Sequence, residues 1–139
     1  MKRIARRTAA VALATATITL GAVGAASANA PGGNETCPSG AFCVYYNSWQ
    51  YGWGSFAAYY PDQVAFGSTT FNIRGDNSGY GLSVWDNAAA IVNNTGDFWK
   101  MCTADYNHCE DYSPGEAGDV SPSIHNLDAS IWDVGILIA

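Results

Sequence analysis

The sequence predicts an all-β domain, a sandwich or barrel of short strands, and three observations support this. No helical periodicity of useful length appears after residue 30. Short runs rich in Val, Tyr, Phe and Trp alternate with Gly, Asn, Asp, Ser and Pro, the pattern of strands joined by frequent turns. The chain also repeats a motif, which indicates two similar units that pack together into one core.

The first 28 residues have the features of a secretory signal peptide. Residues 1–7, MKRIARR, hold four of the six basic residues, and an apolar run from Ala9 to Ala26 follows. This run is short and rich in weakly apolar Ala and Thr, which argues against a membrane anchor, and it ends in the small-x-small pattern Ala26-Ser27-Ala28. We therefore expect cleavage after Ala28, a secreted extracellular protein, a flexible mature N-terminus at 29–36 and one domain at 37–139.

Five segments of the mature chain are predicted to be strands because each is rich in aromatic and aliphatic residues. They are 42–46, 55–60, 81–85, 97–101 and 131–138. Turn signals rich in Gly, Pro, Asn and Asp occur at 60–62, 74–79, 94–96 and 113–115. The stretch 66–81, FGSTTFNIRGDNSGYG, is predicted to be an elaborated hairpin or loop inserted in the first unit.

The repeated motif lies in two segments that are 40 positions apart. Residues 86–92, DNAAAIV, and 126–132, NLDASIW, each contain an Asx, two further residues, Ala, then Ala or Ser, and Ile. Upstream, two strand ends are each followed six residues later by a residue suited to a positive φ, Gly52 and His108. The sequence therefore predicts two copies of one unit, at about 37–95 and 96–139.

The charge of the mature chain limits its partners. After Ala28 only Arg74 and Lys100 are basic, against all 12 acids, so the net charge is −10. A nucleic-acid-binding protein needs a basic surface, and an anionic membrane likewise attracts basic segments. We therefore expect neither a nucleic-acid partner nor a membrane association in the mature form. We also expect the mature protein to be a monomer.

All four cysteines lie in the mature chain, and an even number in an oxidising compartment predicts two disulfides. Four cysteines allow three pairings, and we expect the local ones, Cys37–Cys43 and Cys102–Cys109, because each pair is close in sequence. The chain-entropy model gives so short a loop roughly 2.5 kcal/mol, so such bridges chiefly stiffen the loops that they close. Zinc binding with the two histidines is a weaker reading, because the cysteine spacings do not match the CxxC pattern.

The chain also resembles a known family. An aromatic residue followed after five residues by Gly, and then an Asx-rich turn before a closing strand, resembles the Greek-key motif of the βγ-crystallins. Residues 37–48, CPSGAFCVYYNS, and 84–96, VWDNAAAIVNNTG, are more specifically similar to secreted actinobacterial peptidase inhibitors of the Streptomyces metalloproteinase inhibitor type. The likeness covers nearly all of residues 37–138. It implies a βγ-crystallin-like sandwich of two Greek-key motifs and supports the two local disulfides.

The resemblance further implies an inhibitory loop at the second disulfide, CTADYNHC, residues 102–109, with Cys102–Thr103 as the substrate-like bond. The expected partner is an extracellular peptidase, most directly a metallopeptidase, whose zinc activates a water molecule for attack on a carbonyl. A rigid loop binds at little cost in chain entropy, and the disulfide would hold both sides of a cut together. The plainer alternative is that the bridge only pins the end of a hairpin.

One residue of this loop departs from what the resemblance implies. Thermolysin-like enzymes favour a bulky apolar residue just after the cut, and Thr103 is only weakly apolar. Met101 before the bridge, or Tyr106 at the tip of the loop, is the alternative apolar anchor. Together with Cys102 and Ala104, these residues make up the predicted inhibitory loop.

Calcium binding without inhibition is one rival function. Crystallin-type calcium sites use an Asx pair followed by Ser or Thr, which supply hard oxygen ligands. Asp86 and Asn87 keep the pair but Ala90 replaces the hydroxyl, whereas Ser130 keeps the hydroxyl but Leu127 breaks the pair. Asp86, Asn87 and Ser130 are therefore only weak calcium candidates, and we expect no other cofactor. The simpler reading is that these Asx residues cap turns.

Carbohydrate or cell-wall binding is a second rival. Residues 49–53, WQYGW, place three aromatic residues within five positions, and on an exposed loop they would stack on sugar rings. We favour the interpretation that they pack in the core or at the edge of the sandwich. Enzymatic activity is not expected, because no GxSxG, HExxH or CxxC motif occurs, although the many carboxylates leave a glycosidase-like pair open.

Overall fold

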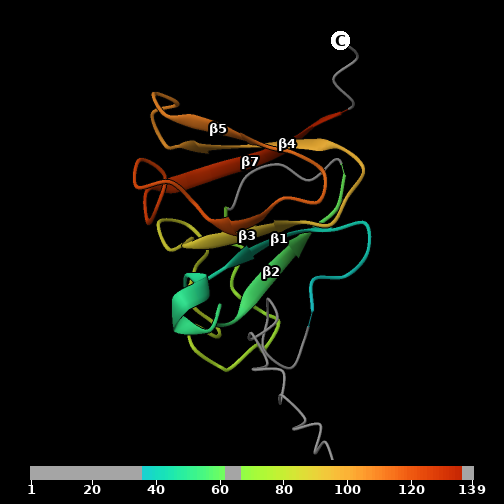
Figure 1. Ribbon diagram of the computed structural model, residues 1–139. Helices are drawn as coiled ribbons and strands as arrows, with labels where there is room; N and C mark the ends of the chain where they lie inside the picture. Colours follow the sequence, from blue (N-terminus) through green and yellow to red (C-terminus); the bar gives the residue numbers. More distant parts are fainter. Residues whose placement is uncertain (1–35, 62–66, 136–139) are drawn as a thin grey trace, which may run out of the picture.

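The computed structural model describes residues 36–61 and 67–135, which form two antiparallel β-sheets packed as layers (Figure 1). The first sheet has the strand order β2-β1-β3-β6, and the second has the order β5-β4-β7. The strands are β1 (Phe42–Tyr45), β2 (Phe56–Tyr59), β3 (Ala90–Asn93), β4 (Phe98–Thr103), β5 (Cys109–Tyr112), β6 (Ala117–Asp119) and β7 (Asp128–Gly135). A single 3-10 turn, η1 (Trp49–Tyr51), is the one helical element in these ranges. The all-β prediction is confirmed.

Two of the N-terminal predictions lie outside what the structure describes. The predicted signal peptide, 1–28, is wholly outside the described residues, and so is the predicted flexible segment 29–36 except for Thr36. In the described part of the chain, no helix has the length and apolar character needed to cross a membrane.

Four of the five predicted strands form. The segments 42–46, 55–60, 97–101 and 131–138 correspond to β1, β2, β4 and β7, although residues 136–138 are outside the described part. The predicted strand at 81–85 is wrong, because this segment makes only the isolated bridge Thr70↔Ser83. Gly79 and Gly81 have φ of 76° and 82°, so the chain turns where a strand would have to begin. The inserted stretch 67–81 is irregular, as predicted for a loop, and Phe66 is not described.

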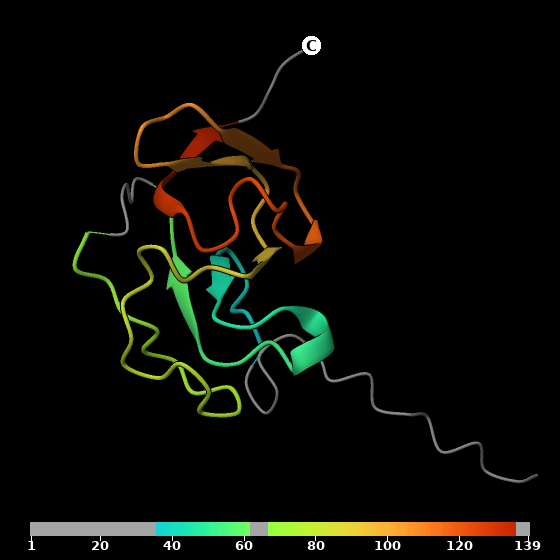
Figure 2. The same cartoon turned by 90° about the vertical axis from the view of Figure 1, so that its left-hand side faces the viewer.

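The strand order repeats between the two sheets. In the first, β1 forms a hairpin with β2 and pairs with β3 on its other side; in the second, β4 pairs with β5 and β7 in the same way. The remaining strand, β6, follows β5 in the chain but pairs with β3 in the first sheet. Figure 2 shows how the chain passes between the two layers to reach it. The two halves are therefore joined by backbone hydrogen bonds as well as by packing.

The two copies of the repeated motif also bind each other directly. Asp86 and Asn126, at equivalent positions, have φ of 58° and 57°, a conformation that Asx residues tolerate. The Asp86 N–H donates to the Asp128 carbonyl over 2.9 Å, and the Asn126 N–H donates to the Ala88 carbonyl over 3.1 Å. The two turns are thus held side by side where the halves meet.

The positive φ predicted six residues after a strand end occurs in the first unit but not at the predicted residue in the second. Gly52 has φ of 83°, as predicted, and ends η1. His108 does not have a positive φ; Tyr106, two residues earlier, has φ of 57° instead. The reason is that the turn after β4 closes within residues 103–106, before the chain reaches His108.

The main core lies between the two sheets. Phe42 of β1 stacks on Trp99 of β4 with ring centroids 5.1 Å apart, so the central strands of both layers meet there. Strand β1 is buried on both faces, because Cys43 and Tyr45 pack into a second cluster with Trp53. The other members of the main core are Val44, Ala57, Tyr59, Phe71, Val84, Ala88, Ile91, Met101, Tyr112, Val120, Ile124 and Ile131.

Both predicted disulfides are confirmed. Cys37 is bonded to Cys43, with Cα atoms 5.8 Å apart, and Cys102 to Cys109, with Cα atoms 4.1 Å apart. All four cysteines of the chain are therefore paired, and the zinc–thiolate reading is wrong.

Candidate functional site

The second disulfide closes a hairpin loop between β4 and β5. Cys102 and Cys109 lie opposite each other as the last residue pair of the β4–β5 ladder. The six residues between them, 103–108, cross from the central strand of the second sheet to its edge strand. Residues from Ala104 to Cys109 are exposed. The bridge therefore closes a short loop that is accessible to another molecule.

Backbone hydrogen bonds fix the path of this loop. The Thr103 N–H donates to the His108 carbonyl over 3.0 Å and extends the hairpin by one rung beyond the disulfide. The Tyr106 N–H donates to the Thr103 carbonyl, also over 3.0 Å, and closes a four-residue turn. Tyr106 adopts the left-handed conformation in this turn, with φ of 57°. A non-glycine residue in that region costs of order 1–3 kcal/mol, so the surrounding contacts must hold it.

The carboxylate of Asp105 supplies those contacts. Its Oδ1 accepts hydrogen bonds from the Thr103 hydroxyl at 2.6 Å and from the Asn107 N–H at 3.1 Å, and its Oδ2 accepts one from the Asn107 amide at 2.6 Å. These bonds, led by the one from Thr103, lower the pKa of Asp105 to about 2. The side chain is exposed and stays ionised at any ordinary pH, so the loop keeps its internal bonds.

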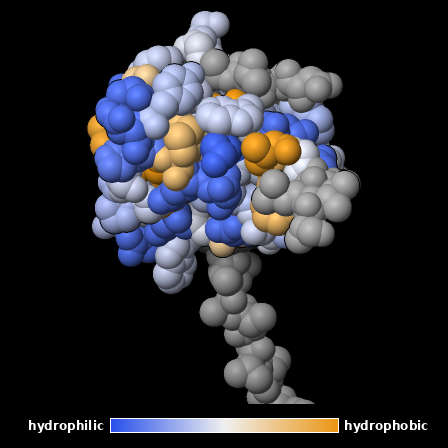
Figure 3. Space-filling view, turned by 90° about the horizontal axis from the view of Figure 1, so that it is seen from above, coloured by the Kyte–Doolittle hydropathy of each residue, from blue (hydrophilic) through white to orange (hydrophobic). Residues whose placement is uncertain are grey.

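Tyr106 is the most exposed large side chain of the loop. It is 63% exposed, and its ring centroid lies 6.3 Å from that of Trp132 on β7. At the base of the loop, Leu127 is 53% exposed and lines a shallow cavity of about 330 Å³ together with Asp86, Ala104 and His108. Hydrophobic groups on this side of the molecule are scattered among hydrophilic ones (Figure 3). An aromatic side chain at the tip is therefore the main apolar contact that the loop offers.

The structure separates the predicted loop residues into two groups. Ala104 and Tyr106 are exposed, but Met101 and Cys102 are 0% exposed and Thr103 is 6% exposed. Cys102 and Thr103 belong to β4, where they pair with Ser130 and Asp128 of β7. The predicted Cys102–Thr103 bond therefore lies within β4, and the Met101 side chain is buried in the core. The accessible bonds lie between Ala104 and Cys109.

The predicted contact residues of the loop did not include Asp105 and Asn107, which organise it. The signal was present in the sequence, because Thr-x-Asp-x-Asn between paired strands is the pattern of side chains that bond their own backbone in turns. Trp132 carried no such signal, since it is 26 residues from Tyr106 and only the β4–β7 pairing brings it near.

The calcium candidates do not fit a metal site well. Asn87 donates its amide to the Trp85 carbonyl over 2.9 Å and so caps its own turn, while Asp86 is exposed and Ser130 is buried in β7. Calcium needs six to eight oxygen ligands. Among the described residues no group of three or more His, Cys, Asp or Glu side chains lies close enough to hold a metal ion.

The aromatic run 49–53 is divided between core and surface. Trp53 is buried and packs edge-on against Tyr45, with centroids 5.2 Å apart, as the packing interpretation requires. Trp49 and Tyr51 are 62% and 72% exposed, so the prediction that all three aromatic residues pack in the core or at its edge does not hold for these two.

Comparison with known proteins adds no assignment. No protein-family model matches the chain, and neither does any curated protein or solved structure.

Proposed function

We propose that this protein is a secreted peptidase inhibitor that presents the loop 103–109 to its target, most directly a metallopeptidase. The observation that carries the proposal is that this loop is exposed, closed by a disulfide and held by internal hydrogen bonds to an ionised carboxylate. Such a segment loses little conformational entropy on binding, which is the property that a tight substrate-like inhibitor needs.

The fold is compatible with the family that the sequence resembles. The orders β2-β1-β3 and β5-β4-β7 repeat, β6 crosses to the other sheet, and the Asx turns of the two halves pair. These features support the proposal of a βγ-crystallin-like sandwich of two Greek-key motifs. Fold alone does not specify inhibition, so the loop remains the basis of the functional proposal.

The exposed bond before Tyr106 is the best candidate for the substrate-like bond. Tyr106 would supply the bulky apolar residue after the cut that Thr103 cannot supply, and its ring is free of the core. The peptide between Asp105 and Tyr106 lies within the turn closed by the Thr103 carbonyl. After a cut there, the disulfide and the strands would keep the new ends close, and religation would compete with release.

The charge of the protein favours a basic target. The mature net charge of −10 would steer association with a basic peptidase and oppose it with an acidic one. Near the loop, Glu110 and Asp111 follow on the edge strand, although Asp111 is paired with Lys100 at 2.7 Å. The association rate should therefore fall as the salt concentration rises.

The proposal is tested by titrating the mature chain, residues 29–139, against a panel of metallo-, serine and cysteine peptidases. The key variants are Tyr106→Ala, which removes the exposed side chain, and the double change of Cys102 and Cys109 to Ser. Trp85→Ala is the matched control, because Trp85 is a surface aromatic residue, 40% exposed, outside this loop. We expect at least one metallopeptidase to be inhibited, with both loop variants weaker by about tenfold or more and the control unchanged.

Two outcomes would contradict the proposal. One is that no peptidase of the panel is inhibited by a chain whose disulfides are shown to be formed. The other is inhibition that retains its full strength in both loop variants, which would move the contact to another surface.

A further inference from the structure

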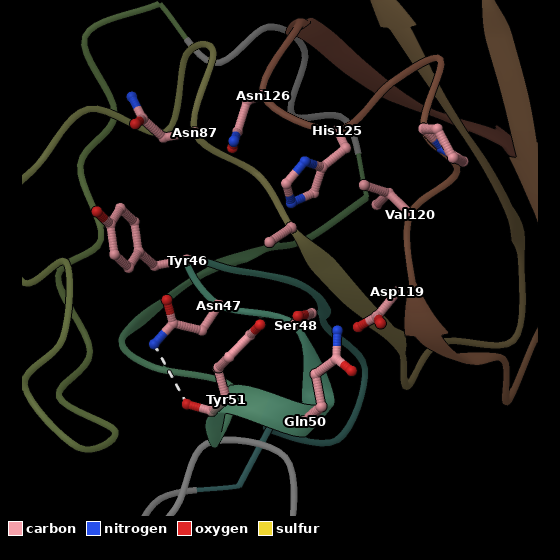
Figure 4. Close-up of a pocket in the computed structure, with 12 residues that line it drawn as sticks. Tyr46, Asn47, Ser48, Gln50, Tyr51, Asn87, Asp119, Val120, His125 and Asn126 are labelled. Atoms are coloured by element: carbon pink, nitrogen blue, oxygen red, sulfur yellow. Dashed lines mark hydrogen bonds between the residues drawn. The ribbon is translucent and has the colours of Figure 1, made fainter.

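A second cavity lies on the first sheet, away from the inhibitory loop. It has a volume of about 460 Å³, within the roughly 300–1,000 Å³ of small-molecule sites. Its walls come from residues 46–51 around η1, from the first Asx turn at 87–89, and from the segment 119–126 of the second half (Figure 4). We propose that this cavity binds a neutral saccharide.

The polar lining has the chemistry of hydroxyl recognition. Four amide side chains line the cavity, those of Asn47, Gln50, Asn87 and Asn126. An amide offers donors and acceptors together, which matches sugar hydroxyls that also donate and accept. Within the described residues, the side chains of Gln50 and Asn126 make no hydrogen bond of their own, so they are available to a ligand.

Aromatic rings supply the apolar part of the site. Tyr51 lines the cavity and is 72% exposed, so its ring is accessible to a ligand. Tyr46 belongs to the same segment of the lining, and its half-buried ring packs edge-on against Phe71 with centroids 5.6 Å apart. Rings of this kind cover the C–H faces of a sugar while neighbouring amides bind its hydroxyls.

The walls are fixed before any ligand binds. The Trp49 N–H donates to Oδ1 of Asp119 over 2.8 Å, which fastens η1 to β6 of the other half. Asn47 donates its amide to the Ser78 hydroxyl over 3.1 Å and to the Tyr51 carbonyl over 3.4 Å. The Val120 N–H donates to the Ala89 carbonyl over 3.1 Å. A preformed site of this kind loses little entropy on binding.

The charge of the lining selects a neutral ligand. The cavity contains one carboxylate, Asp119, whose Oδ1 already accepts the Trp49 N–H, and no lysine or arginine lines it. An anionic ligand would meet no lysine or arginine there, and the chain after residue 28 carries a net charge of −10. Sulfated or phosphorylated sugars are therefore disfavoured relative to uncharged ones.

The experiment is a calorimetric and NMR titration of the mature chain with cellotriose, chitotriose, maltotriose and mannotriose, and with a sulfated heparin disaccharide. The variants are Tyr51→Ala and Gln50→Ala, with Trp85→Ala as the matched control. We expect at least one neutral trisaccharide to shift the resonances of cavity residues. Its affinity should fall at least about fivefold in both cavity variants and change less than about twofold in the control. The sulfated disaccharide should cause no shift.

Three results would overturn the inference. They are the absence of binding by all four neutral sugars at millimolar concentration, equal binding of the sulfated disaccharide, or equal loss of affinity in Trp85→Ala. Inhibition of a peptidase should be the same in Tyr51→Ala as in the unchanged protein. A failure of the saccharide site is thereby distinguished from a failure of the inhibitory loop.

Discussion

Asp105 shows how one residue can define the shape of an exposed loop. Its carboxylate is open to solvent, where a single ion pair contributes little, but it accepts three hydrogen bonds from Thr103 and Asn107. These bonds close around Tyr106 and hold its left-handed backbone. Because the pKa of Asp105 is lowered, the ionised form favours the folded loop at and above pH 4, and this contribution is lost as the pH falls through about 2.

Thr103→Val should raise the pKa of Asp105 from about 2 toward its ordinary value of 3.8, because it deletes the largest stabilising hydrogen bond. Valine keeps the shape of threonine, so the buried position should tolerate it at a cost of about 1–2 kcal/mol. The measurement is a carboxyl-carbon NMR titration, with the carboxyl groups of the first sheet in the same spectra as internal controls. An unchanged titration of Asp105 would mean that the Thr103 hydroxyl does not hold the loop.

At the scale of the element, the hydrophobic pattern predicted β1, β2, β4 and β7, but it missed β3, which lies between β1 and β6, as well as β5 and β6. Strands β1, β2, β4 and β7 are rich in aromatic or aliphatic side chains, such as Trp99 and Met101 of β4, which are buried. Strands β5 and β6, with the sequences CEDY and AGD, have no such pattern. They are strands because a neighbouring strand offers them backbone hydrogen bonds. For β5 this neighbour is β4, which is close in sequence, whereas for β6 it is β3, which is distant in sequence.

The candidate loop was only partly predictable for a similar reason. Cysteine spacing predicted the bridge at 102–109, since the two cysteines are close in sequence and the chain is expected to be exported. It could not predict which side of the bridge is exposed. Burial of Met101, Cys102 and Thr103 depends on β7, which comes from residues 128–135 and covers the end of β4.

The long connection between β2 and β3 depends on glycine at one close contact. Gly79 has φ of 76°, and a Cβ added there would lie 2.1 Å from Cγ of Tyr46. Gly81 has a similar φ of 82°, but an added Cβ would meet no atom within 4 Å. The two glycines are therefore a matched pair that differs only in the space around the missing Cβ.

Gly81→Ala should lower the free energy of unfolding by about 1–2 kcal/mol, the cost of a left-handed alanine. Gly79→Ala carries the same cost and must also displace the Tyr46 ring, so it should be less stable by about a further 1–3 kcal/mol. Urea unfolding of both variants measures the difference. Equal losses would show that Tyr46 moves away from Gly79 without cost.

At the scale of the whole molecule, Asp128 lies where the two halves join. It is 0% exposed, its Oδ1 accepts the Ala88 N–H over 2.9 Å, and its carbonyl accepts the Asp86 N–H. Its Oδ2 has no partner among the described residues. Burial raises the pKa of Asp128 from 3.8 to about 7, and the nearby charge of Asp86 adds to the effect.

This raised pKa makes the stability of the protein depend on pH. The folded state holds the Asp128 proton at pH values where the unfolded chain has lost it, so the stabilisation is complete below about pH 4 and is lost as the pH rises through about 7. The change is at most about 4 kcal/mol for a single group. Asp128→Asn should remove this dependence of stability on pH, because asparagine cannot ionise. The variant should still fold, because the asparagine side-chain oxygen can accept the Ala88 N–H.

Urea unfolding of both proteins from pH 4 to pH 8 tests this, and the difference between the two curves isolates Asp128 from the histidines. The unchanged protein should lose stability relative to Asp128→Asn across this range. Parallel curves would contradict the raised pKa.

The sequence by itself determined that this chain forms short antiparallel strands, repeats one motif and closes two local disulfides, because these features depend on alternation, turn residues and near neighbours. Only the tertiary structure decided which residues of the loop 102–109 are exposed, that β6 completes the sheet of the other half, and that Tyr51 lines a cavity. Each of these depends on contacts between residues far apart in the chain, and burial at such contacts is a property of the packed fold that no local pattern contains.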